Sequence, residues 1–97
     1  MLQKRRFKKD NVTKVTFVLP ADVVGDTIHL VGEFNDWQAS QAFKKQKDQS
    51  WRLTLSLEPG SEYQFRYLLN KHDWFNDPAA DRFAPNPYGE QNSVVIT

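Results

Sequence analysis

The sequence has no cysteine and only two histidines, which removes most of the common catalytic and metal-binding chemistries. A chain without cysteine forms no disulfide and no thiolate metal site. His29 and His72 do not form a paired metal-binding motif, and the chain has neither a GxSxG elbow nor a glycine-rich phosphate loop. Asp73, Asp77 and Asp81 could supply a glycosidase carboxylate pair, but they occupy a polar turn and a proline-rich segment. We therefore expect no metal, no cofactor and no catalytic residue.

Long apolar runs are also missing, so the sequence offers no membrane-spanning helix. The basic N-terminus is not followed by the apolar segment of a secretory signal. These absences predict a cytoplasmic protein without a membrane partner, and the net charge of +1 argues against a dedicated nucleic-acid binder. Five cations between residues 4 and 9 indicate a solvated, flexible arm over residues 1–11, with a phosphate-contacting arm as the less favoured alternative. Residues 12–97 are expected to form one domain.

Apolar and polar residues alternate with a period of two in most of the chain, which is the pattern of half-buried β-strands. Turn residues such as Pro59-Gly60 separate the segments. Recurring short strands with turn signals between them predict an all-β, antiparallel β-sandwich. Residues 77–89 contain three prolines and are expected to form a long ordered loop before the last strand. The expected strands cover residues 14–19, 27–30, 51–57, 63–70 and 93–97.

The three tryptophans fall into two groups. Trp51 begins an alternating apolar strand, which predicts a core position. Trp37 follows the turn pair Asn35-Asp36, and Trp74 lies in Lys71-His72-Asp73-Trp74, a polar segment that we expect to form a hairpin tip. Either of these two indoles could fold back as a lid on the sandwich. Alternatively, each could be an exposed platform for a flat, partly apolar ligand such as a pyranose ring.

Several segments together resemble one known family. The segments "VTKVTFVLP", "IHLVGEFNDWQ", "LEPGSEYQFRYLL", "WFNDP" and "PNPYGEQNSVV" follow in the order and spacing of the family-48 carbohydrate-binding modules. This group includes isoamylase N-terminal early set domains and the glycogen-binding domain of the AMP-activated protein kinase beta subunit. The resemblance covers roughly residues 12–97, and it implies an immunoglobulin-like sandwich that binds α-1,4-glucans such as glycogen or starch.

The resemblance also implies a site. Trp37 and Trp74 match the two sugar-stacking tryptophans of the kinase-type domain, Arg66 takes the place of a lysine, and Asn92 matches an asparagine. Tyr88 and Glu90 replace a leucine and a threonine, so the contacts in that loop differ from the kinase type. The turn before Trp74 is also one residue longer. The implied ligand-binding set is Trp37, Arg66, Trp74, Tyr88, Glu90 and Asn92.

Two functions stay open at this point. The first is a non-catalytic module that binds α-1,4-glucans through tryptophan stacking. The second is a protein-interaction or accessory module of a glycogen- or starch-metabolising enzyme, in which the exposed aromatic residues dock a protein. Most relatives carry this module before a catalytic barrel, so the activity of that barrel is not transferred to this chain. The initial methionine and the basic segment favour a free-standing small protein.

Overall fold

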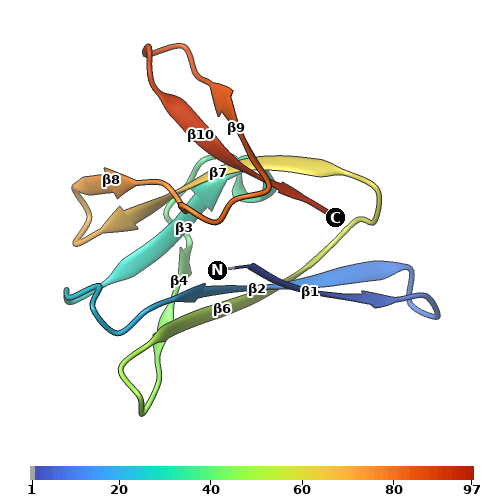
Figure 1. Cartoon of the computed structure of the whole chain (residues 1–97), viewed down its shortest axis with the longest axis horizontal. Helices are drawn as coiled ribbons and strands as arrows, with labels where there is room; N and C mark the ends of the chain where they lie inside the picture. Colours follow the sequence, from blue (N-terminus) through green and yellow to red (C-terminus); the bar gives the residue numbers. More distant parts are fainter. Residues whose placement is uncertain (1) are drawn as a thin grey trace.

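The computed structural model describes residues 2–97, which form two antiparallel sheets packed face to face (Figure 1). The four-stranded sheet has the order β1-β2-β6-β5, with β1 (Leu2–Phe7), β2 (Val12–Leu19), β5 (Lys44–Lys45) and β6 (Trp51–Leu57). The six-stranded sheet has the order β4-β3-β7-β10-β9, and β8 pairs with β7. Its strands are β3 (Ile28–Gly32), β4 (Gln41–Ala42), β7 (Glu62–Leu69), β8 (Asp73–Phe75), β9 (Arg82–Pro85) and β10 (Gln91–Ile96). A short 3₁₀ helix, η1 (Glu33–Asn35), follows β3. The predicted antiparallel sandwich is confirmed.

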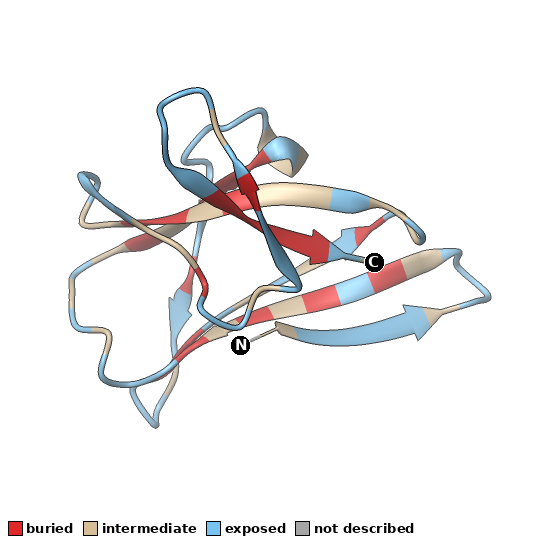
Figure 2. Ribbon diagram, turned by 45° about the horizontal axis from the view of Figure 1, so that its top comes forward, coloured by how far each residue is buried: buried red, intermediate tan, exposed pale blue. Residues whose placement is uncertain are grey.

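The core lies between the two sheets, where the inward-facing residues of their strands meet (Figure 2). Phe17 of β2 packs edge-on against Phe65 of β7, with ring centroids 5.2 Å apart, and Tyr67 stands beside Phe65. Edge-to-face pairs of this kind add to the stabilisation from buried area. Trp51 is buried as predicted, and its Nε1 donates to the Val23 carbonyl at 2.9 Å. The partner for the indole N–H explains how such a large residue is accommodated in the core.

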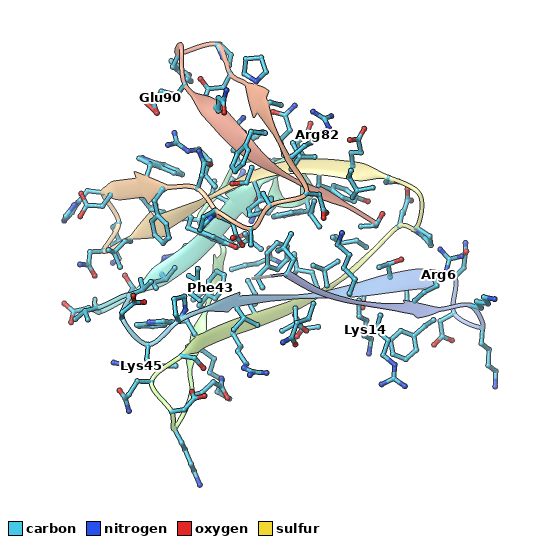
Figure 3. The ribbon with its side chains drawn as sticks, in the orientation of Figure 1. Arg6, Lys14, Phe43, Lys45, Arg82 and Glu90 are labelled. Carbon is cyan, nitrogen blue, oxygen red and sulfur yellow. The ribbon has the colours of Figure 1, made fainter. Side chains whose placement is uncertain are left out.

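The expected flexible arm over residues 1–11 is wrong for residues 2–7, because β1 pairs with β2 along its whole length, and residue 1 lies outside the described residues. Leu2 lies opposite Phe17 and packs against the core. Lys4 reaches the segment that precedes β9, where its Nζ contacts the Asp81 carboxylate at 2.5 Å. Basic residues are compatible with a strand at this position, since an edge strand leaves long cationic side chains in water. Figure 3 shows Arg6 and Lys14 along this hairpin.

The expected loop over residues 77–89 is also only partly correct, because β9 lies inside it and pairs with β10. The segment before β9 is fixed by the buried carboxylate of Asp77. That carboxylate accepts hydrogen bonds from the Tyr67 hydroxyl at 2.7 Å and from the Ala79 N–H at 2.8 Å. The Asp77 N–H donates to Ser93 Oγ at 2.9 Å. These bonds compensate the cost of burying the polar groups and hold the chain at the start of β9.

No helix in the described part of the chain is both long enough and apolar enough to span a bilayer.

Candidate functional site

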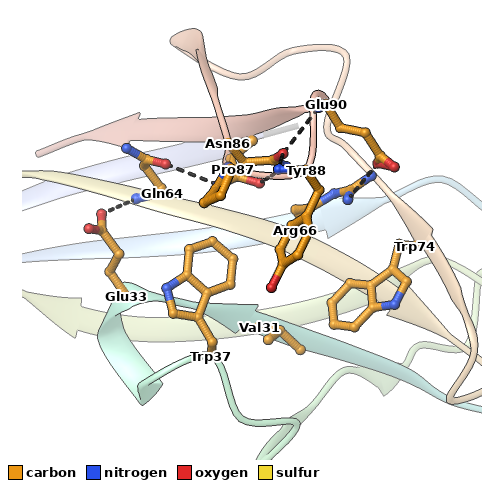
Figure 4. Close-up of a pocket in the computed structure, with 11 residues that line it drawn as sticks. Val31, Glu33, Trp37, Gln64, Arg66, Trp74, Asn86, Pro87, Tyr88 and Glu90 are labelled. Carbon is orange, nitrogen blue, oxygen red and sulfur yellow. Dashed lines mark hydrogen bonds and ion pairs between the residues drawn. The ribbon is translucent and has the colours of Figure 1, made fainter.

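A groove of about 750 Å³ lies on the outer face of the six-stranded sheet (Figure 4). Val31 of β3 and Arg66 of β7 are cross-strand partners within it. Arg66 faces outward because its neighbours Phe65 and Tyr67 point into the core. All six residues of the expected site lie around this groove. The groove is lined by Val31, Glu33, Trp37, Gln64, Arg66, Trp74, Asn86, Pro87, Tyr88, Glu90 and Asn92.

Trp37 is positioned by a turn that the side chain of Asn35 closes. Asn35 Oδ1 accepts from the Gly32 N–H at 2.9 Å, and its Nδ2 donates to the Leu30 carbonyl at 2.8 Å. The chain then passes through positive φ at Asp36 (54°) and Trp37 (60°), and the Trp37 N–H donates to the Gly32 carbonyl at 2.8 Å. The turn leaves Trp37 42% exposed at the edge of the groove.

Trp74 comes from a strand and not from the hairpin tip that the sequence suggested. It is the central residue of β8 and lies opposite Leu68 of β7. The tip is formed instead by Asn70 and Lys71, both with positive φ. Because residues opposite each other in a sheet share one face, Trp74 projects from the same outer face as Arg66. Its side chain is 48% exposed.

Arg66 and Glu90 form an ion pair at the groove, with Nη1 3.0 Å from Oε2. The Arg66 side chain is mostly buried, whereas Glu90 is largely exposed. Among the described residues, the buried Nε of Arg66 has no hydrogen-bond partner. A guanidinium carries five donors, so the contact with Glu90 leaves it able to donate to hydroxyls. The pair gives the groove both a donor and an acceptor.

The loop between β9 and β10 is ordered by Asn86. Its Oδ1 accepts from the backbone N–H groups of Tyr88 and Glu90 at 3.0 and 3.1 Å. Its Nδ2 donates to Asn92 Oδ1 at 3.1 Å, and Asn92 Nδ2 donates to Gln64 Oε1 at 3.0 Å. Asn92 is 6% exposed and both ends of its amide are engaged, so it supports the loop from below. The ring of Tyr88 is strongly exposed and lies between the two indoles in Figure 4.

Sequence reasoning missed five lining residues: Val31, Glu33, Gln64, Asn86 and Pro87. Two of them had a usable signal, since Gln64 lies two residues before Arg66 and Val31 lies in the neighbouring strand, where period-two alternation allows the same face. Glu33 had no such signal in the sequence. Its Oε1 accepts a hydrogen bond from the Gln64 N–H at 2.6 Å, and these residues are 31 positions apart in the chain. Within residues 2–97 no group of three or more His, Asp or Glu side chains is placed to hold a metal ion.

A family model described as the glycogen recognition site of AMP-activated protein kinase matches residues 8–96. The chain belongs to this family. Its glycogen-recognition family membership supports carbohydrate binding, and carbohydrate-binding modules are typically non-catalytic. The match contains every residue that lines the groove, whereas β1 precedes it. The comparison with curated proteins found no significant match.

Proposed function

We propose that this groove binds α-1,4-linked glucans of the glycogen or starch type without catalysing their cleavage. One observation carries the proposal: Trp37 and Trp74 come from separate elements, remain about half exposed, and line the same groove. Burial of an aromatic side chain is worth kilocalories, so two large apolar rings left at one polar-rimmed site mark a ligand-binding surface.

The chemistry of a pyranose ring fits these residues. Its C–H faces are apolar and stack on aromatic rings, while its rim carries hydroxyls that donate and accept hydrogen bonds. Trp37, Trp74 and Tyr88 supply rings, and the Arg66–Glu90 pair supplies a donor and an acceptor in the same groove. In this proposal Asn92 acts through the loop that it supports, because its amide is already engaged.

The linkage preference follows from the placement of the rings. Trp37 extends from a turn after β3, whereas Trp74 extends from β8 on the other side of Val31 (Figure 4). Rings on separate elements suit a curved chain, which the α-1,4 linkage produces. A flat β-1,4 ribbon would stack on one ring and leave the other.

Affinity electrophoresis in native gels with and without glycogen tests the proposal. Trp37→Ala and Trp74→Ala are each expected to lower the affinity for glycogen, measured from the retardation, by about tenfold to a hundredfold. This range is taken by analogy with about 1–3 kcal/mol per stacked base. Phe83→Ala is the matched control, since Phe83 is also 42% exposed and lies outside the groove. Its retardation should equal that of the wild type.

The same variants separate the site from the core. Trp37→Ala and Trp74→Ala are expected to keep the free energy of unfolding within about 1 kcal/mol of the wild type, whereas Trp51→Ala removes a buried side chain and costs about 3–5 kcal/mol. A wild-type protein that glycogen does not retard would contradict glucan binding. That result would favour the second function, an accessory module that docks on a glycogen- or starch-metabolising enzyme.

A further inference from the structure

Charge is strongly segregated between the four-stranded sheet, with its hairpin turns, and the rest of the chain. Residues 2–19 and 44–57, which form the four-stranded sheet and its hairpin turns, hold ten of the 13 lysines and arginines but only two of the 12 acidic residues. The formal charge is therefore +8 for these segments and −7 for the rest of the chain, which agrees with the total of +1. None of the residues that line the groove belongs to the four-stranded sheet.

The outward side of this sheet, here called the basic face, carries like charges opposite one another. Arg5 of β1 lies opposite Lys14 of β2, and Lys44 of β5 lies opposite Arg52 of β6. These side chains point outward because their strand neighbours, such as Val15, are buried. Like charges in directly opposed positions destabilise a sheet, so the arrangement has a cost that a bound anion would remove.

The basic face is also shaped around Arg5 and Lys14. Both cations lie over the ring of Phe7, at 5.1 and 5.0 Å from its centroid. Beside them the hydroxyls of Thr16 and Thr54 are hydrogen-bonded at 2.8 Å. These residues line a second hollow, of about 370 Å³. Cations next to hydroxyls are the groups that bind carboxylates and other oxyanions.

Strands β1, β2, β5 and β6 contain no aspartate or glutamate within residues 2–97. An acidic residue that feels the charge of Arg52, Asp48, lies in the β5–β6 turn and accepts hydrogen bonds from the side chain and the backbone N–H of Ser50. These bonds, more than the charge of Arg52, lower the pKa of the Asp48 carboxyl. The cations of the basic face therefore have no carboxylate among them on the strands themselves.

We infer that the basic face binds an acidic polypeptide, on the side of the molecule opposite the glucan groove. A polypeptide fits better than a nucleic acid, because the aromatic ring on this face is already covered by two cations and offers no stacking platform. It also fits better than a lipid surface, because β1 is the outermost strand of its sheet in the part of the chain that is described. A sheet edge offers main-chain hydrogen bonds that only another peptide can use.

The positive charges on β1 favour an acidic peptide over a basic one. Its sequence LQKRRF carries three cations, which repel a second copy of the same strand and attract an acidic one. In a second copy, Glu62, Asp81 and Glu90 are three of the ten acidic residues outside these segments, and each already pairs with a cation of its own molecule. The proposed partner is a different chain.

Binding on the basic face leaves the groove free, since the two surfaces lie on the outward sides of different sheets. The protein would then hold a glucan on one side and an acidic segment on the other. This inference does not depend on the glucan proposal, and each can fail while the other stands.

Fluorescence anisotropy with a short labelled poly-L-glutamate tests the inference on the full chain. Binding should be present at low salt and fall steeply between about 50 and 200 mM salt, because the contacts are ionic. Arg5→Gln/Lys14→Gln is expected to weaken it by at least about tenfold. The control Lys71→Gln/Arg82→Gln removes the same charge outside the basic face and should bind like the wild type.

Labelled oligothymidylate of equal charge and vesicles containing phosphatidylserine serve as competing probes. Weaker binding of both than of poly-L-glutamate supports the acidic polypeptide, and tighter binding of either overturns it. Equal losses in the two charge-matched variants, or no poly-L-glutamate binding at low salt, also overturn it. Circular dichroism of each variant reports folding independently of either ligand.

Discussion

At Trp37 the backbone adopts a conformation that a bulky side chain rarely takes. Its φ of 60° follows a φ of 54° at Asp36, and both lie in the left-handed region. This region costs a non-glycine residue roughly 1–2 kcal/mol, which the hydrogen bonds of Asn35 and of the Trp37 N–H offset. Strained residues concentrate at functional sites, where the surrounding structure holds them. The strain at Trp37 is consistent with a ring that is held outward for a ligand.

Tyr67 makes stability depend on pH in the alkaline range. Burial, and secondarily the nearby Asp77 carboxylate, raises the pKa of its hydroxyl far above the ordinary tyrosine value. An unfolded tyrosine ionises near pH 10, whereas folded Tyr67 keeps its proton there. The unfolded chain thus holds fewer protons than the folded chain above about pH 10. The free energy of unfolding should then fall by about 1.4 kcal/mol per pH unit from this group.

Urea unfolding from about pH 9 to 11 checks this slope against the Tyr67→Phe variant. The variant loses the hydrogen bond to Asp77 and is expected to be less stable at neutral pH. Its unfolding free energy should fall less steeply above about pH 10, since phenylalanine does not titrate. Parallel curves for the two proteins would show that Tyr67 is not the group responsible.

Individual positions differ in how far the sequence alone determined them. The buried position of Trp51 followed from period-two alternation, which is a local property of its strand. The supporting role of Asn92 did not, because its partners Asn86 and Gln64 lie in other elements and only the fold brings them together. Glu33 was missed for the same reason. Local pattern predicts which face a residue occupies, but not which distant groups it meets there.

Among the elements, β1 is a strand whose basic residues obscured the strand pattern in the sequence. Its charges suggested a solvated arm, yet Leu2 packs against the core and Lys4 contacts Asp81 just before β9. An edge strand needs few buried residues, so its pattern is weak in the sequence. The short strands β8 and β9 were missed for a similar reason, since pairing with β7 and β10 defines them more than their own composition does.

Deleting residues 1–7 should weaken the fold without affecting the groove. The truncation removes the pairing of β1 with β2 and the packing of Leu2 on the core. We expect a loss of at least about 1 kcal/mol, or roughly 4–8 °C in Tm for a domain of this size. Glycogen retardation in native gels should match that of the full chain, because β1 contributes no lining residue.

The variant Lys4→Gln is the control for this truncation, since it removes only the contact with Asp81. Exposed ion pairs contribute little, so its Tm should stay within a few degrees of the wild type. A truncated protein that stays folded but loses retardation would contradict the separation of β1 from the groove.

At the scale of the whole molecule, the total charge of +1 conceals a basic four-stranded sheet and acidic connecting segments in the rest of the chain. The sequence total argued against a dedicated nucleic-acid binder, and the strand order then showed that the cations of residues 2–19 and 44–57 gather on one sheet. The sandwich itself followed from alternation and turn residues, because two-sheet packing is the common solution for short strands of this kind. The arrangement of charge and groove on opposite sides depended on which strands pair.

Titration calorimetry with maltohexaose and cellohexaose tests the central claim, which is that Trp37 and Trp74 together bind a curved α-1,4-glucan. The two ligands have the same number of glucose units and differ in linkage. Maltohexaose should bind at least about tenfold more tightly, because cellohexaose loses one ring stack worth about 1–3 kcal/mol. The affinity for maltohexaose should hardly change with salt, since the ligand is neutral. Equal affinity for the two oligosaccharides, or binding of neither, would contradict the account.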